Sequence, residues 1–330
     1  MAIPIDQGVH TMSNILILGG TGFVGRHLCE QLQRAGHRMT VPTRTLKTAA
    51  PIQHLPGVTV QVTDIHQPDN LARLVAGHDV VINLVAILHG NAKAFHRVHV
   101  TLVESLIAAC QAAGVQRVVH LSALGAHADS TSLYQQTKAQ AEALLNASSL
   151  DVTVLRPSVI FGADDRFLNL FARMQRMLPV LPLAGADCKF QPVWVEDVAK
   201  AVVQTLRQPS TAGQTLELAG PRVYTLRQLV EMAGQAVGAP SKVIGLPVGL
   251  AYFQALFMEM LPGVPLLSTD NISAMETDNV ASPAELGAAT FANLGIHPAA
   301  LEEVVPTYLH ARAGSLAPRE RLIELRANQR

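Results

Sequence analysis

A glycine-rich turn between an apolar strand and a helix constrains this chain more than any other feature. Residues 15–18 are apolar and predict a strand, GGTGFVG follows at 19–25, and residues 26–35 have a helical pattern. Glycines at this spacing allow a tight turn, close approach of a pyrophosphate, and close packing of helix on strand. The helix N-terminus then presents amide groups to the phosphates. The turn predicts a dinucleotide site, whose expected contacts are Gly19, Thr21, Gly22, Phe23, Val24 and Gly25.

Short apolar runs alternate with helical patterns through the rest of the first half. Strands are expected at 37–41, 58–62, 80–85, 117–121 and 152–155, and helices at 71–76, 94–113 and 134–145. This alternation is typical of βαβ units and a parallel sheet. We therefore predict an α/β fold with a Rossmann-type, doubly wound parallel sheet.

The pattern changes after Arg156 and Pro157, where prolines become frequent and the elements shorter. We predict that residues 1–156, with an ordered core from about residue 13, form an NAD(P)-binding Rossmann domain. Residues 157–330 are expected to form a smaller lobe for a substrate or a partner, with one late return to the sheet near 215–218.

The residues that follow the second expected strand indicate which nucleotide is bound. NAD-binding folds carry an acidic residue about 20 residues past the glycines, where it accepts a hydrogen bond from the ribose 2′-hydroxyl. No carboxylate occurs between His37 and Ala50, and Arg44 is present instead. A guanidinium can hold a 2′-phosphate by paired, charge-assisted hydrogen bonds. The sequence therefore favours NADP(H) over NAD(H).

Tyr134 and Lys138 form a YxxxK pattern in an expected helix. Residues four apart share a helix face, so both side chains can reach one substrate. A nearby ammonium is expected to lower the pKa of the phenol and so make it useful in proton transfer. The pair follows a strand that ends at Ser122, which is a further candidate catalytic residue.

With these motifs, the chain resembles the short-chain dehydrogenase/reductase superfamily over nearly its whole length. The phrases that carry the resemblance are ILILGGTGFVG, VINLVA, RVVHLSALGA, VLRPSVIFG and QPVWVEDVA. They match the extended and atypical branches, which include NAD-dependent epimerases and dehydratases. Within these branches, SALGA, FLNLFARMQRMLPVLPLAG and LPGVPLL are similar to the NADPH-binding accessory subunit of respiratory complex I and its bacterial relatives.

The resemblance implies roles for individual residues. Tyr134 and Lys138 match the catalytic pair, whereas the family's working serine lies slightly beyond Ser122, where this chain has Ala123 and Leu124. Part of the oxyanion stabilisation would then lack its donor. The cofactor contacts implied are Gly19, Gly22 and Gly25 at the pyrophosphate, Asp64 and Ile65 at the adenine, and Leu84, Val85, Ala86 and Pro157 along the site.

Charge and composition limit the remaining possibilities. Lys plus Arg and Asp plus Glu both number 25 in 330 residues, so no net field attracts nucleic acid. His96 and His99 are spaced by three, but no carboxylate or cysteine completes a metal site, so no metal is predicted. The first residues lack a basic and apolar leader, which predicts a cytoplasmic protein, with attachment to the inner membrane as an alternative.

Residues 243–261 are almost uncharged and about long enough to cross a bilayer, although Pro247, Gln254 and Glu259 interrupt them. A helix that is apolar all round is buried in protein or touches lipid. We rank a buried lid or subunit contact first, an interfacial membrane helix second, and a membrane span last. Contact with a membrane or a protein complex is thus expected through residues 243–267.

Two functions remain open on the sequence. One is hydride transfer between NADP(H) and a carbonyl or alcohol, such as a quinone or a sugar nucleotide, by Tyr134, Lys138 and Ser122. The other is a non-catalytic, NADPH-holding accessory or assembly protein of a membrane respiratory or quinone-pathway complex. We favour the enzyme, because a protein that only holds the nucleotide needs no Tyr–Lys pair at helical spacing.

Overall fold

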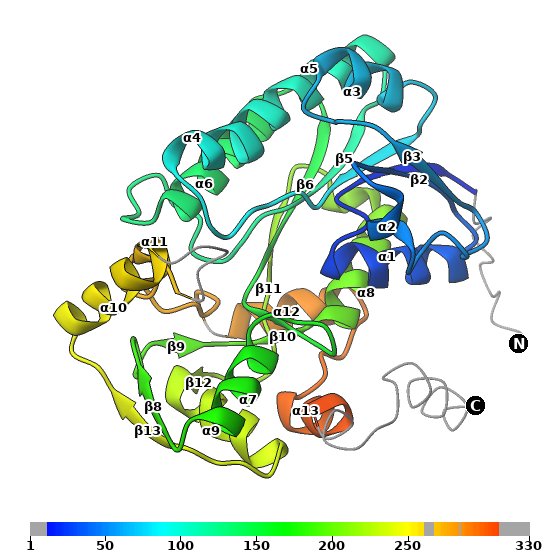
Figure 1. Ribbon diagram of the computed structural model, residues 1–330. Helices are drawn as coiled ribbons and strands as arrows, with labels where there is room; N and C mark the ends of the chain where they lie inside the picture. Colours follow the sequence, from blue (N-terminus) through cyan, green and yellow to red (C-terminus); the bar gives the residue numbers. More distant parts are fainter. Residues whose placement is uncertain (1–11, 261–266, 284, 310–330) are drawn as a thin grey trace, which may run out of the picture.

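The computed structural model describes residues 12–260, 267–283 and 285–309, and its centre is a parallel sheet of seven strands in the order β11-β6-β5-β4-β1-β2-β3 (Figure 1). From β1 the chain proceeds to β2 and β3 on one side, and then to β4, β5 and β6 on the other. This reversal defines a doubly wound sheet and confirms the predicted α/β Rossmann-type fold. The strands are β1 Asn14–Leu18, β2 Arg38–Thr43, β3 Val58–Val62, β4 Val80–Asn83, β5 Arg117–Leu121, β6 Asp151–Pro157 and β11 Thr215–Leu218.

Helices cover both faces of the sheet because the central strands are apolar on both sides. In β1, Ile15 and Ile17 belong to one hydrophobic cluster and Leu16 and Leu18 to the other, as expected for side chains that alternate along a strand. The first cluster includes residues from α1 Phe23–Arg34, α8 Val195–Arg207 and α12 Glu285–Asn293. The second includes residues from α3 Pro68–Val75, α5 Leu102–Ala113 and α6 Leu133–Asn146.

The helix expected at 94–113 is interrupted, which corrects the prediction. It consists of α4 Ala92–Phe95, a π-helical segment η1 His96–Thr101, and α5. Hydrogen bonds in a π-helix span five residues, so the turn is wider than in an α-helix. No glycine or proline lies between residues 91 and 113, so no local pattern predicts this interruption.

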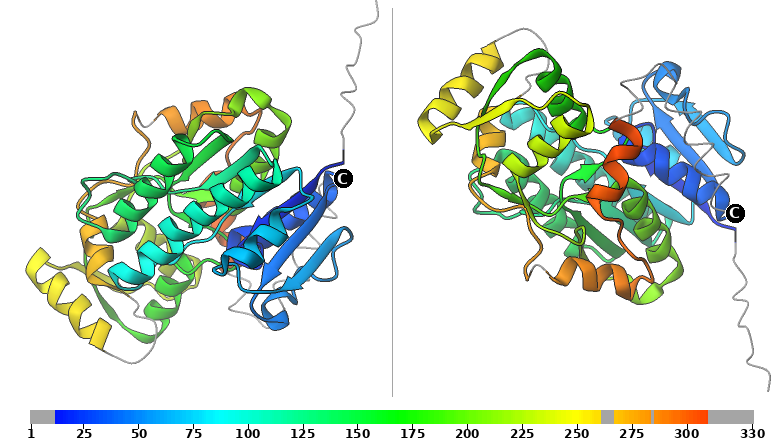
Figure 2. Two further views of the ribbon diagram at one scale, coloured as in Figure 1. Left: turned by 90° about the horizontal axis from the view of Figure 1, so that it is seen from above. Right: turned by 90° about the horizontal axis from the view of Figure 1, so that it is seen from below.

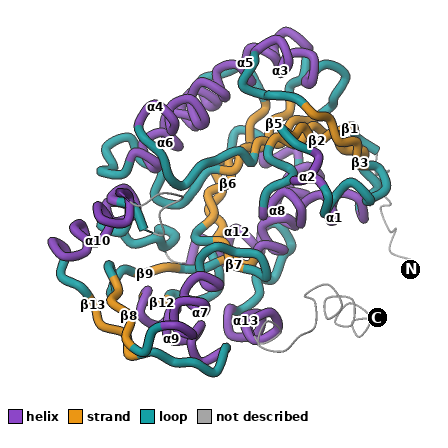
Figure 3. Tube along the Cα trace, viewed as in Figure 1, coloured by secondary structure: helices purple, strands orange, loops and turns teal. Residues whose placement is uncertain are grey.

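The residues after Pro157 contribute to two parts of the molecule. Their α8, β11 and α12 join the central sheet, while most other elements surround a separate hydrophobic cluster (Figure 3). Three two-stranded sheets occur there: β10 with β7, β12 with β9, and β13 with β8. The strands are β7 Ile160–Phe161, β8 Val180–Leu183, β9 Lys189–Phe190, β10 Val193–Trp194, β12 Tyr224–Thr225 and β13 Lys242–Gly245. The helices are α7 Leu168–Met177, η2 Pro209–Thr211, α9 Leu226–Ala236, α10 Val248–Met260, α11 Thr269–Ala274 and α13 Leu301–Leu309; the short α2 Leu46–Ala49 belongs to the first half.

The apolar segment 243–261 divides into β13 and α10, and Leu261 lies outside the described residues. In the part of the chain that the structure describes, every helix is too short or too polar for a membrane span. Only Ala251 and Ala255 of α10 are buried, so the helix is not a lid buried within this chain; the subunit contact that we ranked with the lid stays a prediction. The helix projects at the edge of the molecule in both views of Figure 2, and most of its large apolar side chains are exposed.

Candidate functional site

The predicted cofactor residues gather at the carboxyl edge of the sheet. The glycine turn follows β1, Arg44 follows β2, Asp64 and Ile65 follow β3, and Leu84–Ala86 follow β4. Ser122 follows β5, and Pro157 ends β6. Because all seven strands are parallel, these positions lie along one edge, on both sides of the point where the strand order reverses. Ligands of doubly wound sheets bind in the crevice at that point.

The glycine turn has a backbone that only glycine can form. Gly19 has a φ of +82°, and a Cβ there would lie 3.1 Å from the carbonyl carbon of Leu84. A Cβ on Gly25 would lie 2.5 Å from Gly19 O, which no real Cβ approaches, so α1 packs directly on the turn. Gly22 is exposed at the N-cap of α1, and its Cβ would come 3.1 Å from Gly19 O. The turn therefore fits a pyrophosphate, because it combines a helix N-terminus with a backbone surface free of side chains.

The end of the site near β2 and β3 is electropositive. Arg44 is exposed and makes no ion pair among the described residues. Burial, followed by the charge of Arg97, lowers the pKa of His66, and Arg44 also contributes in the same direction, although Asp64 opposes it. Arg26, the other base near the turn, forms an ion pair with Asp164 at 3.4 Å. Arg44 thus has a guanidinium that is available to a phosphate, as does the exposed Arg97.

Tyr134 and Lys138 lie on α6, one turn apart. Ser132 caps this helix by accepting a hydrogen bond from Gln135 N at 3.4 Å. Lys138 is 1% exposed and donates a hydrogen bond from Nζ to Leu121 O at the end of β5, 2.6 Å away. Helix α6 therefore presents both side chains to the carboxyl edge of the sheet, beside the cofactor residues.

The pKa of Tyr134 differs from the sequence prediction. Burial, with a contribution from the negative charge of Asp270, raises the pKa of the phenol to about 12, so the expected lowering by Lys138 is wrong. The physical reason is that removing the phenolate from water dominates its pKa. Burial also lowers the pKa of Lys138 to about 8, against an opposing effect of Glu142. Near neutral pH, Tyr134 is therefore a phenol and Lys138 is still mainly an ammonium.

Ser122 is buried next to this pair. It is 4% exposed, its amide donates to Leu155 O at 2.7 Å, and its Oγ has no hydrogen-bond partner among the described residues. Buried hydroxyls normally have a hydrogen-bond partner, so an unpartnered Oγ at this position fits a site that binds a polar ligand. Leu124, where the family's serine is expected, is buried and apolar.

Sequence reasoning missed two residues that support α6. Asp270, from α11, accepts hydrogen bonds from Ser132 Oγ at 2.9 Å and from Leu133 N at 2.5 Å. His99, which we considered above only as a metal ligand, is 2% exposed and lies 2.9 Å from Thr137 Oγ1. Their positions far from α6 in the sequence gave no local signal. No group of three or more metal-ligating side chains occurs among the described residues.

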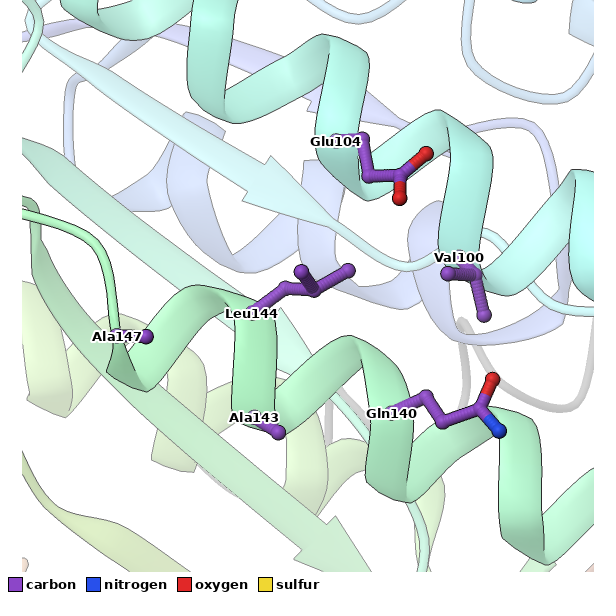
Figure 4. Close-up of a pocket in the computed structure, with 6 residues that line it drawn as sticks. All are labelled: Val100, Glu104, Gln140, Ala143, Leu144 and Ala147. Atoms are coloured by element: carbon purple, nitrogen blue, oxygen red, sulfur yellow. The ribbon is translucent and has the colours of Figure 1, made fainter.

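An open groove lies between α5 and α6 (Figure 4). It is lined by Val100, Glu104, Gln140, Ala143, Leu144 and Ala147. The α6 residues in this set occupy a different face of the helix from Tyr134 and Lys138. The groove is therefore separate from the candidate cofactor site.

Comparison with known proteins assigns the class. The model of the NAD dependent epimerase/dehydratase family matches residues 15–219, from β1 to the end of β11. The chain belongs to this family, whose members are NAD(P)-binding proteins of the short-chain dehydrogenase/reductase type. This result confirms the resemblance drawn from the sequence motifs.

Individual relatives are of two kinds. The chain is 32% identical to subunit 9 of the NADH dehydrogenase (ubiquinone) 1 alpha subcomplex of Arabidopsis thaliana, over 81% of this chain and 70% of that protein. It is 30% identical to a ceramide reductase of Caulobacter vibrioides, over 71% of this chain and 73% of that one. Among solved structures, an epimerase of Methanothermobacter thermautotrophicus has the same fold, with a TM-score of 0.73, 17% identity, and coverage of 96% and 95%.

Proposed function

We propose that this protein binds NADP(H) in preference to NAD(H) and reduces a carbonyl group of a small molecule. The observation that carries the proposal is the half-buried Tyr134 and the buried Lys138 one turn apart on α6, beside the glycine turn of a family that binds NAD(P). A buried ammonium is costly to desolvate, and so, in part, is a half-buried phenol beside it. Their position at the carboxyl edge gives them a use in catalysis.

The preference for NADP(H) rests on the residues after β2. There is no carboxylate between His37 and Ala50 to accept the ribose 2′-hydroxyl, and Arg44 is exposed and without an ion pair among the described residues. The charge of Arg97 adds to the positive potential felt by His66. A phosphate on the 2′-oxygen suits this surface better than a free hydroxyl does.

The state of Tyr134 favours reduction over oxidation. When bound, NADPH would supply the hydride that the carbonyl carbon accepts. As the carbonyl oxygen gains negative charge, Tyr134 Oη donates its proton there, which gives the alcohol and leaves a phenolate that water reprotonates. A pKa of about 12 keeps the phenol protonated at neutral pH, as a donor requires.

Lys138 and Ser122 have supporting roles in this proposal. Lys138 holds a ribose hydroxyl of the cofactor and stabilises the phenolate that Tyr134 leaves behind. Ser122 Oγ, which has no partner among the described residues, donates to the carbonyl oxygen and orients the substrate. Quinones, simple carbonyls and sugar nucleotides are the classes to test as substrates.

Single-turnover loss of NADPH fluorescence, measured against a panel of these substrates, tests the proposal. We expect at least one member to oxidise the bound nucleotide, and Tyr134→Phe to slow this at least about 100-fold with little change in NADPH affinity. Tyr224→Phe is the matched control, because Tyr224 lies on β12 and its hydroxyl donates to Glu302. A signal that persists in Tyr134→Phe would contradict the proposed role.

A second function is favoured by a different observation. On α10, large apolar side chains are more than half exposed: Val248, Leu250, Phe253, Leu256, Phe257 and Met260. Exposed apolar surface of this kind marks contact with proteins or membranes. Together with the relative that is a subunit of NADH dehydrogenase, it supports an accessory or assembly protein that holds NADPH at a membrane-bound complex.

The same panel separates the two functions. The accessory function predicts no turnover with any substrate, and NADPH that survives purification and exchanges slowly. Native mass spectrometry of the purified protein identifies the bound nucleotide and any quinone or lipid. Under this hypothesis, Phe253→Ser with Phe257→Ser reduces recovery with the membrane fraction, whereas Val62→Ser, an exposed apolar residue on β3, does not.

A further inference from the structure

A buried histidine connects the cofactor edge to the helix that carries Tyr134. His99 lies in the π-helical segment η1 and is 2% exposed. Its Nε2 is 3.1 Å from Ile87 N, just beyond the predicted cofactor residues Leu84–Ala86. Its Nδ1 is 2.9 Å from Thr137 Oγ1 on α6, between Tyr134 and Lys138 in the sequence.

These contacts fix the protonation state of the ring. A backbone N–H can only donate, so Nε2 must be the acceptor from Ile87. A neutral imidazole that accepts at Nε2 carries its proton on Nδ1, so Nδ1 donates to Thr137 Oγ1. The Thr137 hydroxyl donates in turn to Leu133 O at 2.7 Å. The hydrogen bonds therefore run in one direction, from Ile87 through His99 and Thr137 to the first turn of α6.

We propose that His99, as a neutral imidazole protonated at Nδ1, is the positioning residue that sets the distance between the cofactor edge after β4 and Tyr134. This inference rests on the proposed reductase function. The ring also contacts Tyr134 edge-on, with ring centroids 5.5 Å apart, so it touches the phenol as well as the backbone of its helix. The wide π turn brings His99 to this position, which agrees with the frequent occurrence of π turns at functional sites.

The surroundings keep the ring neutral. Burial, followed by the positive charge of Lys138, lowers the pKa of His99 to about 3. The other ring neighbours are Phe95 and Tyr134, with ring centroids at 5.6 and 5.5 Å, and both are uncharged at neutral pH. A protonated ring would also lose the acceptor that Ile87 N requires.

Long-range 15N spectra of histidine side chains test this directly on the full-length protein without cofactor. The chain has 13 histidines, so the His99 signal is assigned by its loss in His99→Gln. We expect the Nδ1–H tautomer, unchanged between pH 5 and pH 8, a range chosen to span the ordinary histidine pKa of about 6.5. An Nε2–H tautomer, or titration of this ring near pH 6.5, would overturn the inference whether or not the protein is an enzyme.

Paired variants then test the positioning role. His99→Gln can still offer an acceptor near the Nε2 position, whereas His99→Phe removes both hydrogen bonds; Thr137→Val removes only the link to α6. We expect kcat to fall about tenfold or more in His99→Phe and Thr137→Val, with a smaller change in KM and partial rescue in His99→Gln. His96→Gln is the control, because His96 is exposed on the same π segment.

Thermal unfolding separates positioning from general destabilisation. If His99→Phe and Thr137→Val lose kcat only in proportion to lost folded protein, or if His96→Gln has the same effect, the positioning role is contradicted. If no substrate of the panel is reduced even by the wild type, the reductase proposal fails. The tautomer measurement still decides whether the directed hydrogen bonds exist.

Discussion

The lowered pKa of Lys138 leads to a quantitative prediction for the pH dependence of NADPH binding. Burial lowers the pKa of its ammonium to about 8 from a usual 10.5. If only the ammonium holds the ribose hydroxyl, bound cofactor restores the pKa toward its usual value, and binding takes up a proton above pH 8. At one unit above this pKa, about one protein molecule in ten carries the charge, so the Kd at pH 9 should be about tenfold weaker than at pH 7. This equals a loss of about 1.4 kcal/mol.

The lowered pKa of Lys138 also affects the stability of the cofactor-free protein. Between pH 8 and 10.5 the unfolded chain keeps the proton on Lys138 whereas the folded chain releases it. The free energy of unfolding of the cofactor-free protein therefore receives a contribution that rises with pH over this range, while cofactor affinity falls. The cofactor's 2′-phosphate titrates near pH 6, outside this range.

Calorimetric titration at pH 7, 8 and 9, in buffers that differ in ionisation enthalpy, measures both the Kd and the proton uptake. Lys138→Met is the control: it should bind NADPH more weakly at pH 7 and show no dependence on pH through this range. A wild-type Kd that stays constant from pH 7 to pH 9 would refute the reasoning. So would the same slope in Lys138→Met, because the titrating group would then lie elsewhere.

Three further predictions concern the turn and α6. Gly22→Val should abolish NADPH binding, measured by calorimetry, but leave the protein folded. Gly25→Ala, whose Cβ would lie 2.5 Å from backbone atoms, should instead lower the free energy of unfolding by up to about 3 kcal/mol, measured by circular dichroism. Asp270→Asn should lower the pKa of Tyr134, seen as phenolate absorbance at a lower pH than in the wild type, since its negative charge helps to raise that pKa. Glu142→Gln should lower the free energy of unfolding in urea by about 2 kcal/mol, because the guanidinium of Arg156 loses its buried carboxylate partner. An unchanged urea midpoint would contradict this.

Much of the fold could be predicted because its signals are local. The apolar runs at β3, β5 and β11 gave the observed bounds, since each strand is short, apolar and followed by a change of pattern. The glycine turn could be predicted equally well, because the close backbone contacts at positions 19 and 25 leave no room for a side chain. In the strands, and in the contact of Gly25 with Gly19, the residues that determine the structure are close together in the sequence, whereas Gly19 also contacts the distant Leu84.

The site depended on contacts that the sequence does not display. The raised pKa of Tyr134 comes from burial and from Asp270, which lies 136 residues further along the chain. The interruption of the helix at 96–101 places His99 against α6, and no glycine or proline in this segment indicates it. On α10, periodicity could not separate a buried helix from an exposed one, because apolar residues occur all round it.

The proposed preference for NADP(H) is tested most directly by titrating the cofactor-free protein with NADPH and with NADH in a calorimeter at pH 7. We expect NADPH to bind at least about tenfold more tightly, a difference of about 1.4 kcal/mol or more. Arg44→Asp should erase or reverse this difference, and Lys47→Asp, at another exposed base of the same segment, should change it less. Equal affinities of the wild type for the two nucleotides would contradict the account.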